Sequence, residues 1–300
     1  MKVLTQKRFE ADNIDELYYF AIDRVLYNPE YVVRPRGMEI HEVLNTQLVL
    51  TNPKNCLVHS KARKLNYAFT IMEKLQYLSG DTDSNRLSFY NGNFSNFKNE
   101  YDYFDGDYGT RIAYWLEHIY RLLKKDKDSR QAVYTIYGVQ DRHSSKDIPC
   151  TLSHQFFIRD NKLHMTANMR SNDLLWGFPY DVNGFVFIQE FLAAALGLEM
   201  GTYTHNVGSL HIYTERADQL KAVLEDETKL KIENPAIEQG IDFKQYILDV
   251  HMLLKIEQMY KMHHDDEAML LEKMLPTSLL AYLNVLKKKI FEKRDKLEHI

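Results

Sequence analysis

The sequence predicts an α/β fold of the α+β kind, in which a mixed β-sheet is flanked by helices and followed by a helical C-terminal region. Three observations support this expectation. Short runs rich in β-branched and aromatic residues lie between residues 132 and 169, helical periodicity flanks them, and the pattern becomes wholly helical beyond Glu225. We therefore expect a catalytic body over residues 1–225 and a separate helical region over residues 226–300.

The composition narrows the class of protein. Apolar residues make up 45% and charged residues 27% of the 300 residues, which is ordinary globular usage and excludes collagen-like or wholly disordered chains. The net charge of −4 gives no indication of nucleic-acid binding. No apolar run reaches the roughly 18 residues of a membrane span, and the N-terminus MKVLTQKRFE lacks the apolar core of a signal peptide. We expect a cytoplasmic protein that binds neither membrane nor nucleic acid.

The first predicted helix covers residues 62–79 and ends at Gly80, a residue that commonly terminates helices. Four apolar side chains in it recur at helical spacing: Leu65, Phe69, Met72 and Leu75. Glu73 lies on this helix. Residues 86–109 are crowded with Asn, Asp, Gly, Tyr and Phe, a composition that predicts a structured loop of the kind that often builds sites.

The predicted sheet comes from three runs separated by polar turns. They are AVYTIYGV from Ala132, QFFI from Gln155 and LHMTANM from Leu163. We expect a turn at FPYDVNG and then a buried helix over FVFIQEFLAAALGL, which ends at Gly197 or shortly after.

The C-terminal pattern predicts two amphipathic helices, one before and one after Pro276. Their apolar faces comprise Phe243, Ile247, Val250 and Leu254 in the first, and Leu279, Leu283, Leu286 and Ile290 in the second. Thr277 or Ser278 is expected to cap the second helix. Its last turns are rich in Lys and Arg, a pattern of a solvated face or of a surface for an acidic partner.

Cys56 and Cys150 are the two cysteines, so the sequence offers no disulfide framework. It also lacks paired metal-ligand spacings such as CxxC and HExxH, and we expect no metal site. Cys150 lies in DIPCTLSHQFF, at a turn before a strand, where a thiolate could be presented. A buried, inert cysteine and a Cys–His hydrolase are the alternatives. Polar groups in apolar surroundings also occur in MRSND and HNVGSLHIY.

Taken in order, these segments resemble the thymidylate synthase and pyrimidine-nucleotide hydroxymethylase family. The strongest stretch runs from IPC at 148–150 through RSNDLLWGFPYD at 170–181 to HIY at 211–213. Upstream, MEKLQYLSGDT is similar to the family's HELLWFLxGDT segment, and GDYGTR at 106–111 is similar to GPVYGxxWR. About 180 residues are covered. The resemblance implies a thymidylate synthase fold, a homodimer, and a reaction of a pyrimidine nucleoside monophosphate with 5,10-methylenetetrahydrofolate.

The resemblance also implies the catalytic residues. Cys150 would be the thiolate that adds to pyrimidine C6 and makes C5 nucleophilic. Glu73 would be the carboxylate that organises proton transfers through ordered water, and Tyr108 would assist removal of the C5 proton. Without the flanking match, a surface glutamate and a packed loop tyrosine would be the ordinary interpretations.

Binding residues follow from the same resemblance. Arg170 and Ser171 would bind the phosphate, together with Arg34 or Arg36 and with Arg130 of the partner subunit. The position after Arg130 is Gln131, where the family has a second arginine. The sugar hydroxyl and the folate are each assigned their own residues. They are His211 and Tyr213 for the sugar, and Asp173, Phe94 and Gly177 for the folate.

Asp181 occupies the position that reads the base, where thymidylate synthases carry Asn. An amide offers both donor and acceptor groups to uracil, whereas a carboxyl accepts from the cytosine amine and, when protonated, donates to N3. Family members with Asp here are cytidylate hydroxymethylases. An N-cap role for Asp181, before a helix that begins near Val182, is the alternative.

The expected product is the hydroxymethyl nucleotide, formed when water rather than hydride reaches the C5 intermediate. Phe94 and Phe97 stand where the synthases have shielding tryptophans, a change compatible with water entry. The family's closing C-terminal tail has no counterpart in the helical region. The sequence therefore predicts folate-dependent hydroxymethylation of dCMP or CMP. Methylation of dUMP, and a non-catalytic nucleotide-binding protein that acts through its helical tail, are the alternatives.

Overall fold

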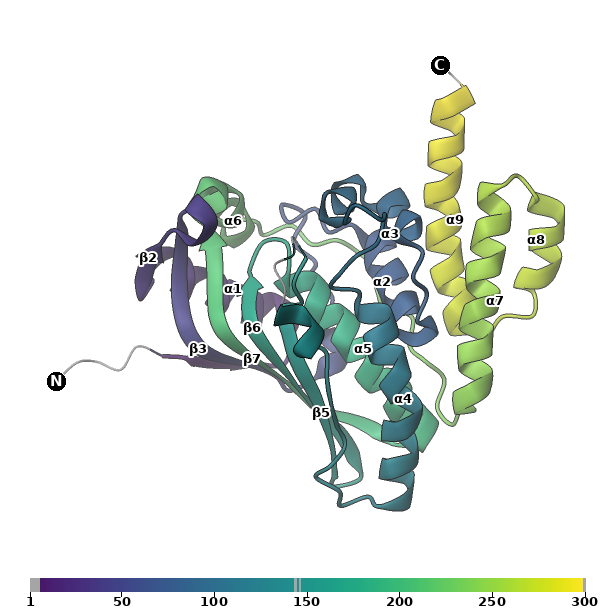
Figure 1. The fold of residues 1–300 in the computed structure, drawn as a ribbon, viewed down its shortest axis with the longest axis horizontal. Coiled ribbons are helices and arrows are strands. Elements are labelled where there is room, and N and C mark those ends of the chain that lie inside the picture. The colour runs from purple at the N-terminus through teal and green to yellow at the C-terminus, as the bar shows by residue number, and fades with distance from the viewer. Residues whose placement is uncertain (1–5, 143–144, 146, 299–300) are drawn as a thin grey trace.

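The computed structural model describes residues 6–142, 145 and 147–298. The strands are β1 Arg8–Ala11, β2 Tyr31–Val33, β3 Ile40–Leu50, β4 Val133–Thr135, β5 Thr151–Arg159, β6 Lys162–Asp173 and β7 Glu199–Tyr213. The helices are α1 Ile14–Tyr27, α2 Tyr67–Ser79, α3 Ser84–Tyr90, α4 Tyr108–Lys125, α5 Phe178–Leu196, α6 Ala217–Leu224, α7 Phe243–Lys261, α8 Asp265–Glu272 and α9 Thr277–Glu298. Figure 1 shows these helices stacked against one side of a curved sheet.

The sheet is mixed, as the sequence predicts. Its strand order is β1-β3-β7-β6-β5-β4, with β2 paired to β3. The pairs β1–β3 and β6–β7 are parallel, and the other pairs are antiparallel. Since parallel strands end at the same edge of a sheet, the carboxyl ends of β6 and β7 meet there, with Asp173 beside His211.

The layers follow from which face of each element is apolar. Along β6, alternate side chains are buried beneath α5, and they are Leu163, Met165, Ala167 and Met169. Helix α2 packs on α5, and α7 and α9 pack on α2, so the molecule continues outward from the sheet in successive helical layers (Figure 1). The core is continuous through these layers.

The opposite face of the sheet is polar and partly exposed. A ladder of side-chain hydrogen bonds crosses it from β3 to β5. Gln47 donates to Asn206, Asn206 donates to Asn168, and Asn168 donates to Ser153, each at 3.0 Å. No helix within the described residues packs over this ladder.

Two predicted helix boundaries differ in the structure. Helix α2 begins at Tyr67 rather than at residue 62, because the Asn66 side chain accepts the Phe69 N–H and caps the helix there. It ends at Gly80, with φ +67°, as expected. Helix α5 begins at Phe178, so the turn expected at FPYDVNG is wrong, because Pro179 fits the first helical turn. Gly197 ends α5 with φ +68°.

The loop expected at residues 86–109 is partly helical. It contains most of α3, a 3-10 helix over Gly92–Phe97 and the start of α4. Asp107 accepts the N–H groups of Gly109 and Thr110 and so caps α4. Local capping by Asp and Asn accounts for helices in a segment whose composition indicates a loop.

The C-terminal layer consists of α7, α8 and α9. The apolar residues predicted on the faces of its two long helices are buried except Ile247, which is half-buried. Glu257 is fully buried and accepts hydrogen bonds from Arg86 at 2.8 Å and Tyr90 at 2.6 Å, and Lys261 lies 2.5 Å away. These contacts attach α7 to α3.

Several basic residues of α9 bind within the chain rather than facing solvent. Lys287 pairs with Glu272, Arg294 pairs with Asp265, and Lys293 donates to the Phe89 carbonyl. Ser278 donates its N–H and its hydroxyl to Glu238. Within the described ranges, no helix has the length and apolarity needed to cross a bilayer.

Candidate functional site

The candidate site lies where β5 begins and where β6 and β7 end. Arg170 N–H donates to the Cys150 carbonyl at 2.8 Å, which ties the residue before β5 to β6. On the other side of β6, Ser171 pairs with Ser209 of β7. The parallel pairing thus places the MRSND and HNVGSLHIY segments, which the sequence singled out separately, at one edge of the sheet.

Cys150 is half-buried and lies against the Arg170 guanidinium. Nη2 of Arg170 is 3.5 Å from Sγ, and its nitrogens also donate to the carbonyls of Pro149 and Ile148 at 2.9 Å. Burial raises the pKa of the Cys150 thiol, and the charges of Arg170 and Arg36 oppose this shift. An arginine fixed beside the sulfur stabilises the thiolate, the reactive form of cysteine.

Two backbone N–H groups donate to the Tyr108 hydroxyl oxygen, from Cys150 at 3.0 Å and from Thr151 at 3.1 Å. The Thr151 hydroxyl lies 3.1 Å from the same oxygen. Burial and the neighbouring Cys150 raise the pKa of Tyr108. The phenol therefore stays protonated, and its hydrogen is available to another acceptor.

Glu73 of α2 and Asp181 of α5 are two carboxyl groups near the cysteine. Burial, followed by the charge of Asp181, raises the pKa of Glu73 well above its usual range. Burial likewise raises the pKa of Asp181 to about 7. The charge of Asp181 also acts on Cys150 and Tyr108, so these four side chains share one electrostatic environment. All four keep partial access to solvent.

Asp181 does not cap α5. Gly177 occupies the N-cap, and the Asp181 side chain accepts the Asn172 amide at 2.7 Å. The capping alternative is wrong because the helix begins three residues before Asp181. Gly177 is required by close approach, since a Cβ atom there would lie 2.7 Å from the Asn172 amide nitrogen and 3.2 Å from the Asp181 carboxylate.

The structure distinguishes the two N-terminal arginines. Arg34 is paired with Glu39 at 2.7 Å, whereas the charge of Arg36 acts on Tyr213 and on Cys150. Arg36 has φ +54°, a conformation uncommon for non-glycine residues. It therefore lies at the candidate site and Arg34 does not. His211 is buried, with Nδ1 3.2 Å from the Ser209 carbonyl.

Asp173 and Arg63 lie on the α1 side of the site. Asp173 accepts the N–H groups of Leu175 at 2.8 Å and Trp176 at 3.1 Å, and burial raises its pKa. Arg63 is 7% exposed, and its guanidinium lies 5.3 Å from the Tyr180 ring centre. Its Nε and Nη2 have no hydrogen-bond partner in the described part of the chain. Such buried, unsatisfied donors point to an anionic ligand group.

Two of the expected residues stand apart from this cluster. Phe94 packs on Phe69 at 5.1 Å, and Phe69 contacts Tyr180, so Phe94 reaches the site only through two other rings. Arg130 is exposed, and its carbonyl accepts from Gln155 on β5. The structure does not bring Arg130 into the cluster around Cys150.

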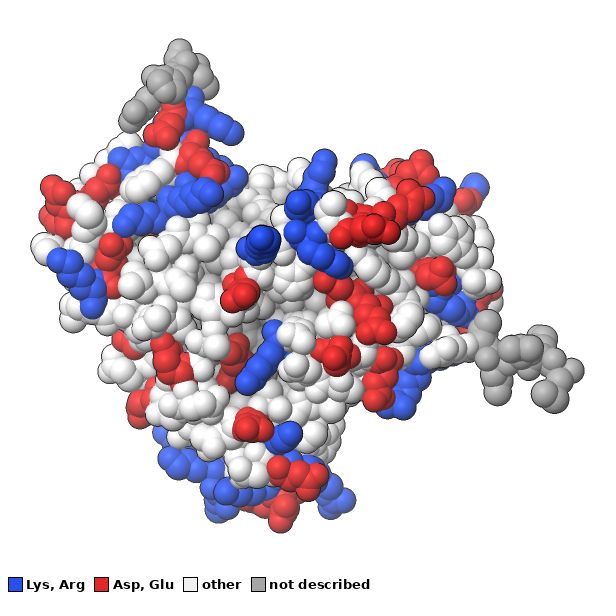
Figure 2. Space-filling model, turned by 180° about the vertical axis from the view of Figure 1, so that it is seen from behind, with Lys and Arg blue, Asp and Glu red and all other residues white. Residues whose placement is uncertain are grey.

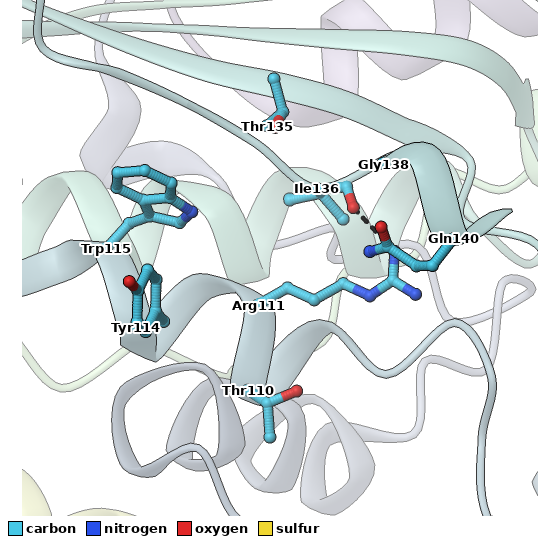
Figure 3. A pocket seen from close by; sticks show the side chains of 8 residues that line it. All are labelled: Thr110, Arg111, Tyr114, Trp115, Thr135, Ile136, Gly138 and Gln140. Atoms are coloured by element: carbon cyan, nitrogen blue, oxygen red, sulfur yellow. Dashed lines mark hydrogen bonds between the residues drawn. The ribbon is translucent and has the colours of Figure 1, made fainter.

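A cavity of about 350 Å³ lies beside α4, away from Cys150 (Figure 3). Arg111 extends along it, but its guanidinium binds both Asp141 oxygens at 2.6 and 2.8 Å and the Ile136 carbonyl. Among the residues that the structure describes, no three His, Cys, Asp or Glu side chains are placed to hold a metal.

Sequence reasoning missed three residues around Asp181 and Asp173, namely Asn172, Tyr203 and Arg63. It singled out His205, and the segment that holds Asn172, as polar groups in apolar surroundings, but it gave no partner for either residue. Partners of buried polar groups come from the pairing of β6 with β7, which periodicity alone does not reveal.

Comparisons with known proteins agree with this geometry. A family model described as thymidylate synthase matches residues 16–265. A deoxyuridylate hydroxymethyltransferase of Bacillus phage SP01 is 32% identical over 226 residues, covering 69% of this chain and 59% of that protein. A thymidylate synthase of Bacillus mojavensis is 31% identical over 132 residues, covering 43% and 47%. The matched stretches thus span about half of the length of these relatives.

The fold itself matches a solved structure. A thermostable thymidylate synthase A from Bacillus subtilis superposes with a TM-score of 0.62 over 77% of this chain and 91% of that chain, at 22% sequence identity. At this identity the match supports the fold alone.

Proposed function

The chain belongs to the thymidylate synthase family, and from this premise we propose that it is a folate-dependent C5 hydroxymethylase of a cytidine monophosphate, dCMP or CMP. The observation that carries the proposal is the shared environment of Cys150, Tyr108, Glu73 and Asp181, because Asp181 brings a carboxyl to the position that the resemblance assigns to base recognition. The hydroxymethyltransferase relative supports the type of reaction, and Asp181 supports the base.

The nucleotide would bind through its phosphate and sugar. Arg170, Ser171 and Arg36 supply charge-assisted and neutral donors for the phosphate. His211 and Tyr213, at the end of β7, would bind the sugar hydroxyl. The charge of Arg36 acts on Tyr213, so phosphate and sugar would be held by adjoining groups.

The thiolate of Cys150 would form a bond to pyrimidine C6, and the electron pair of the C5–C6 double bond would become available at C5 for attack on the one-carbon unit. The charge of Arg170 lowers the pKa of Cys150 against the effect of burial and so favours the thiolate. After attack, the C5 proton would leave to a water molecule, and the Tyr108 hydroxyl and the Glu73 carboxyl would be the groups that orient this water. Burial and the charge of Asp181 raise the pKa of Glu73, which favours the proton-donating form of this carboxyl.

Methylenetetrahydrofolate would supply the one-carbon unit. The residues present fit such a group: the Asp173 carboxyl offers an acceptor for ring N–H groups, and Arg63 offers buried donors with no partner in the described chain. Gly177 lies beside Asp173, and a Cβ atom there would be 3.2 Å from the Asp173 carbonyl oxygen. Phe94 would contribute only through its packing on Phe69.

A homodimer is part of the proposal, with Arg130 contributed to the partner's phosphate site. The polar face of the sheet, with its Gln47–Asn206–Asn168–Ser153 ladder, offers a surface that no helix in the described part of the chain occupies. Figure 2 shows basic and acidic side chains interspersed on the face it presents, with no extended basic tract, a distribution that suits a small anionic substrate better than nucleic acid.

Deoxyuridylate is the second candidate substrate. The phage relative, by its name, acts on deoxyuridylate, and a neutral carboxyl can pair with either base, depending on which oxygen carries the proton. Methylation instead of hydroxymethylation is the second candidate reaction, as in the synthase relatives.

The test uses dCMP, CMP and dUMP labelled with tritium at C5, together with methylenetetrahydrofolate. Release of tritium from a cytidylate and a product mass one hydroxymethyl group larger are expected. Dihydrofolate absorbance would appear only with methylation. An Asp181→Asn variant should gain turnover of dUMP, because an amide serves uracil. Absence of tritium release from both cytidylates would refute the proposal. Release from dUMP alone would then favour the second candidate substrate, and absence of release from all three would leave a non-catalytic nucleotide-binding protein.

A further inference from the structure

A chain of hydrogen bonds leads from the interior of the sheet to Asp181. Tyr203 is joined to His205 at 2.7 Å, His205 to Asn172 at 2.9 Å, and Asn172 to Asp181 Oδ2 at 2.7 Å. We infer that this chain, the Tyr203–Asn172 relay, fixes one oxygen of Asp181 as a hydrogen-bond acceptor and thereby makes Asn172 and His205 positioning residues for base selection. The inference rests on the proposed function because it concerns the same nucleotide site.

The direction of each hydrogen bond follows from the protonation of His205. Burial lowers the pKa of His205 to about 3, so the ring is neutral and carries one N–H. Asn172 turns its Nδ2 to Asp181 and therefore its Oδ1 to His205. His205 Nε2 must then be the donor, and Nδ1 accepts from the Tyr203 hydroxyl. All donors in the relay thus point toward Asp181.

This polarity matters because a neutral carboxyl has one donor oxygen and one acceptor oxygen. Cytosine presents a donor at N4 and an acceptor at N3, whereas uracil presents an acceptor at O4 and a donor at N3. A carboxyl whose proton could sit on either oxygen would pair with both bases. The Asn172 N–H on Oδ2 keeps the proton on Oδ1, so only one of the two bases is matched.

The relay is also held rigidly. Tyr203, His205 and Asn172 are 1%, 0% and 3% exposed. Gly177 lies so close to Asn172 that a Cβ atom would be 2.7 Å from its amide nitrogen. Buried hydrogen bonds of this kind resist reorientation because each broken one leaves a polar group unsatisfied.

The experiment measures equilibrium binding of unreacted nucleotides by calorimetry, without folate. The wild-type chain should bind dCMP about tenfold or more tightly than dUMP. In Asn172→Leu this ratio should fall toward one, and in His205→Phe it should fall part of the way. His205→Gln keeps an amide donor near Asn172 and should retain most of the wild-type ratio.

His154→Phe is the matched control. His154 is fully buried and joined to Tyr134 at 2.9 Å, the same kind of Tyr–His pair, but it has no bond to Asn172 or Asp181. Its loss should lower stability comparably and leave the ratio of dissociation constants unchanged.

The outcomes separate the relay from the proposed function. Equal ratios in wild type, Asn172→Leu and His205→Phe, or a wild-type chain without preference, would overturn the relay. Tighter binding of dUMP by the wild type, with preference lost in Asn172→Leu, would support the relay and contradict cytidylate as the substrate. Binding of neither nucleotide would overturn both proposals.

Discussion

The candidate site and the C-terminal helical layer differ in whether their carboxyl groups have cationic partners. In the site, Glu73 and Asp181 have no cation within hydrogen-bond distance among the described residues, and their pKa values are raised. In the helical layer, the fully buried Glu257 is surrounded by Arg86, Lys261 and Tyr90. A carboxyl without a counterion can gain and lose a proton near neutrality, whereas a paired carboxyl serves only to join elements.

The largest effect on the site side is expected from Cys150→Ala. Loss of the thiolate should reduce tritium release from C5 by about a thousandfold or more, because the adduct at C6 cannot form. The thermal unfolding midpoint should stay near that of the wild type, since Cys150 is only half-buried. Turnover that survives this substitution would remove Cys150 from the mechanism.

The largest effect on the helical side is expected from Glu257→Leu. It removes the buried carboxylate that Lys261 and Arg86 share and leaves Asp81 as the partner of Arg86, and breaking such a buried pair costs about 3 kcal/mol of unfolding free energy. Urea unfolding monitored by circular dichroism provides the measurement. The matched control is Glu292→Gln, which removes an exposed pair with Lys289 and should cost less than about 0.5 kcal/mol. Equal losses in the two variants would contradict the contrast between the regions.

A smaller effect is expected from Gly177→Ala. The backbone of Gly177 has φ −88°, which alanine tolerates, so the cost arises from contact of the new Cβ with Asn172 and Asp181. We expect kcat/KM for the preferred nucleotide to fall about tenfold, with little change in unfolding free energy. Gly197→Ala, at the end of α5 with φ +68°, should show the reverse, a loss of stability with unchanged base preference.

The smallest effect concerns pH. The pKa of Asp181 is raised from 3.8 to about 7 by burial, so ionisation of this group costs stability above pH 7, and the cost declines as the pH falls toward about 4. Asp181→Asn should therefore be more stable than the wild type at pH 8, by on the order of 1–2 kcal/mol, and equal to it near pH 4. Unfolding in urea at both pH values tests this. A difference that grows toward low pH would contradict burial as the cause.

The sequence predicts the site better than it predicts the framework that supports the site. Cys150 and Asp181 lie in motifs with nearly constant spacing, and the structure brings them together. The sequence could not decide whether Arg34 or Arg36 lies at the site. The two residues belong to one short segment and differ only in the partner that each one meets in the folded chain. The elements before residue 62 were not predicted. Strand β1 pairs with β3, which is distant in the sequence, and local sequence patterns do not reveal such a pairing.

The predicted helix boundaries were wrong where a single side chain, rather than the apolar periodicity, determines where the helix begins. Asn66 shortens α2, Pro179 extends α5 at its start, and Asp107 begins α4 within a segment of loop-like composition. The relay was invisible because its members come from β6 and β7 and meet only through strand pairing. Such partners depend on register, which the sequence of a single chain does not specify.

Helix α2 presents consecutive residues to the two contrasted regions. Glu73 belongs to the site, while the next residue, Lys74, donates to Asn234 at 2.9 Å and lies 5.3 Å from the Tyr282 ring of α9. A substitution at Asn234 or Tyr282 would therefore change how α2, the helix that carries Glu73, packs against its neighbours. Libraries built to improve turnover should therefore sample these distant positions together with the pocket, because substitutions there can move α2 and with it the Glu73 side chain.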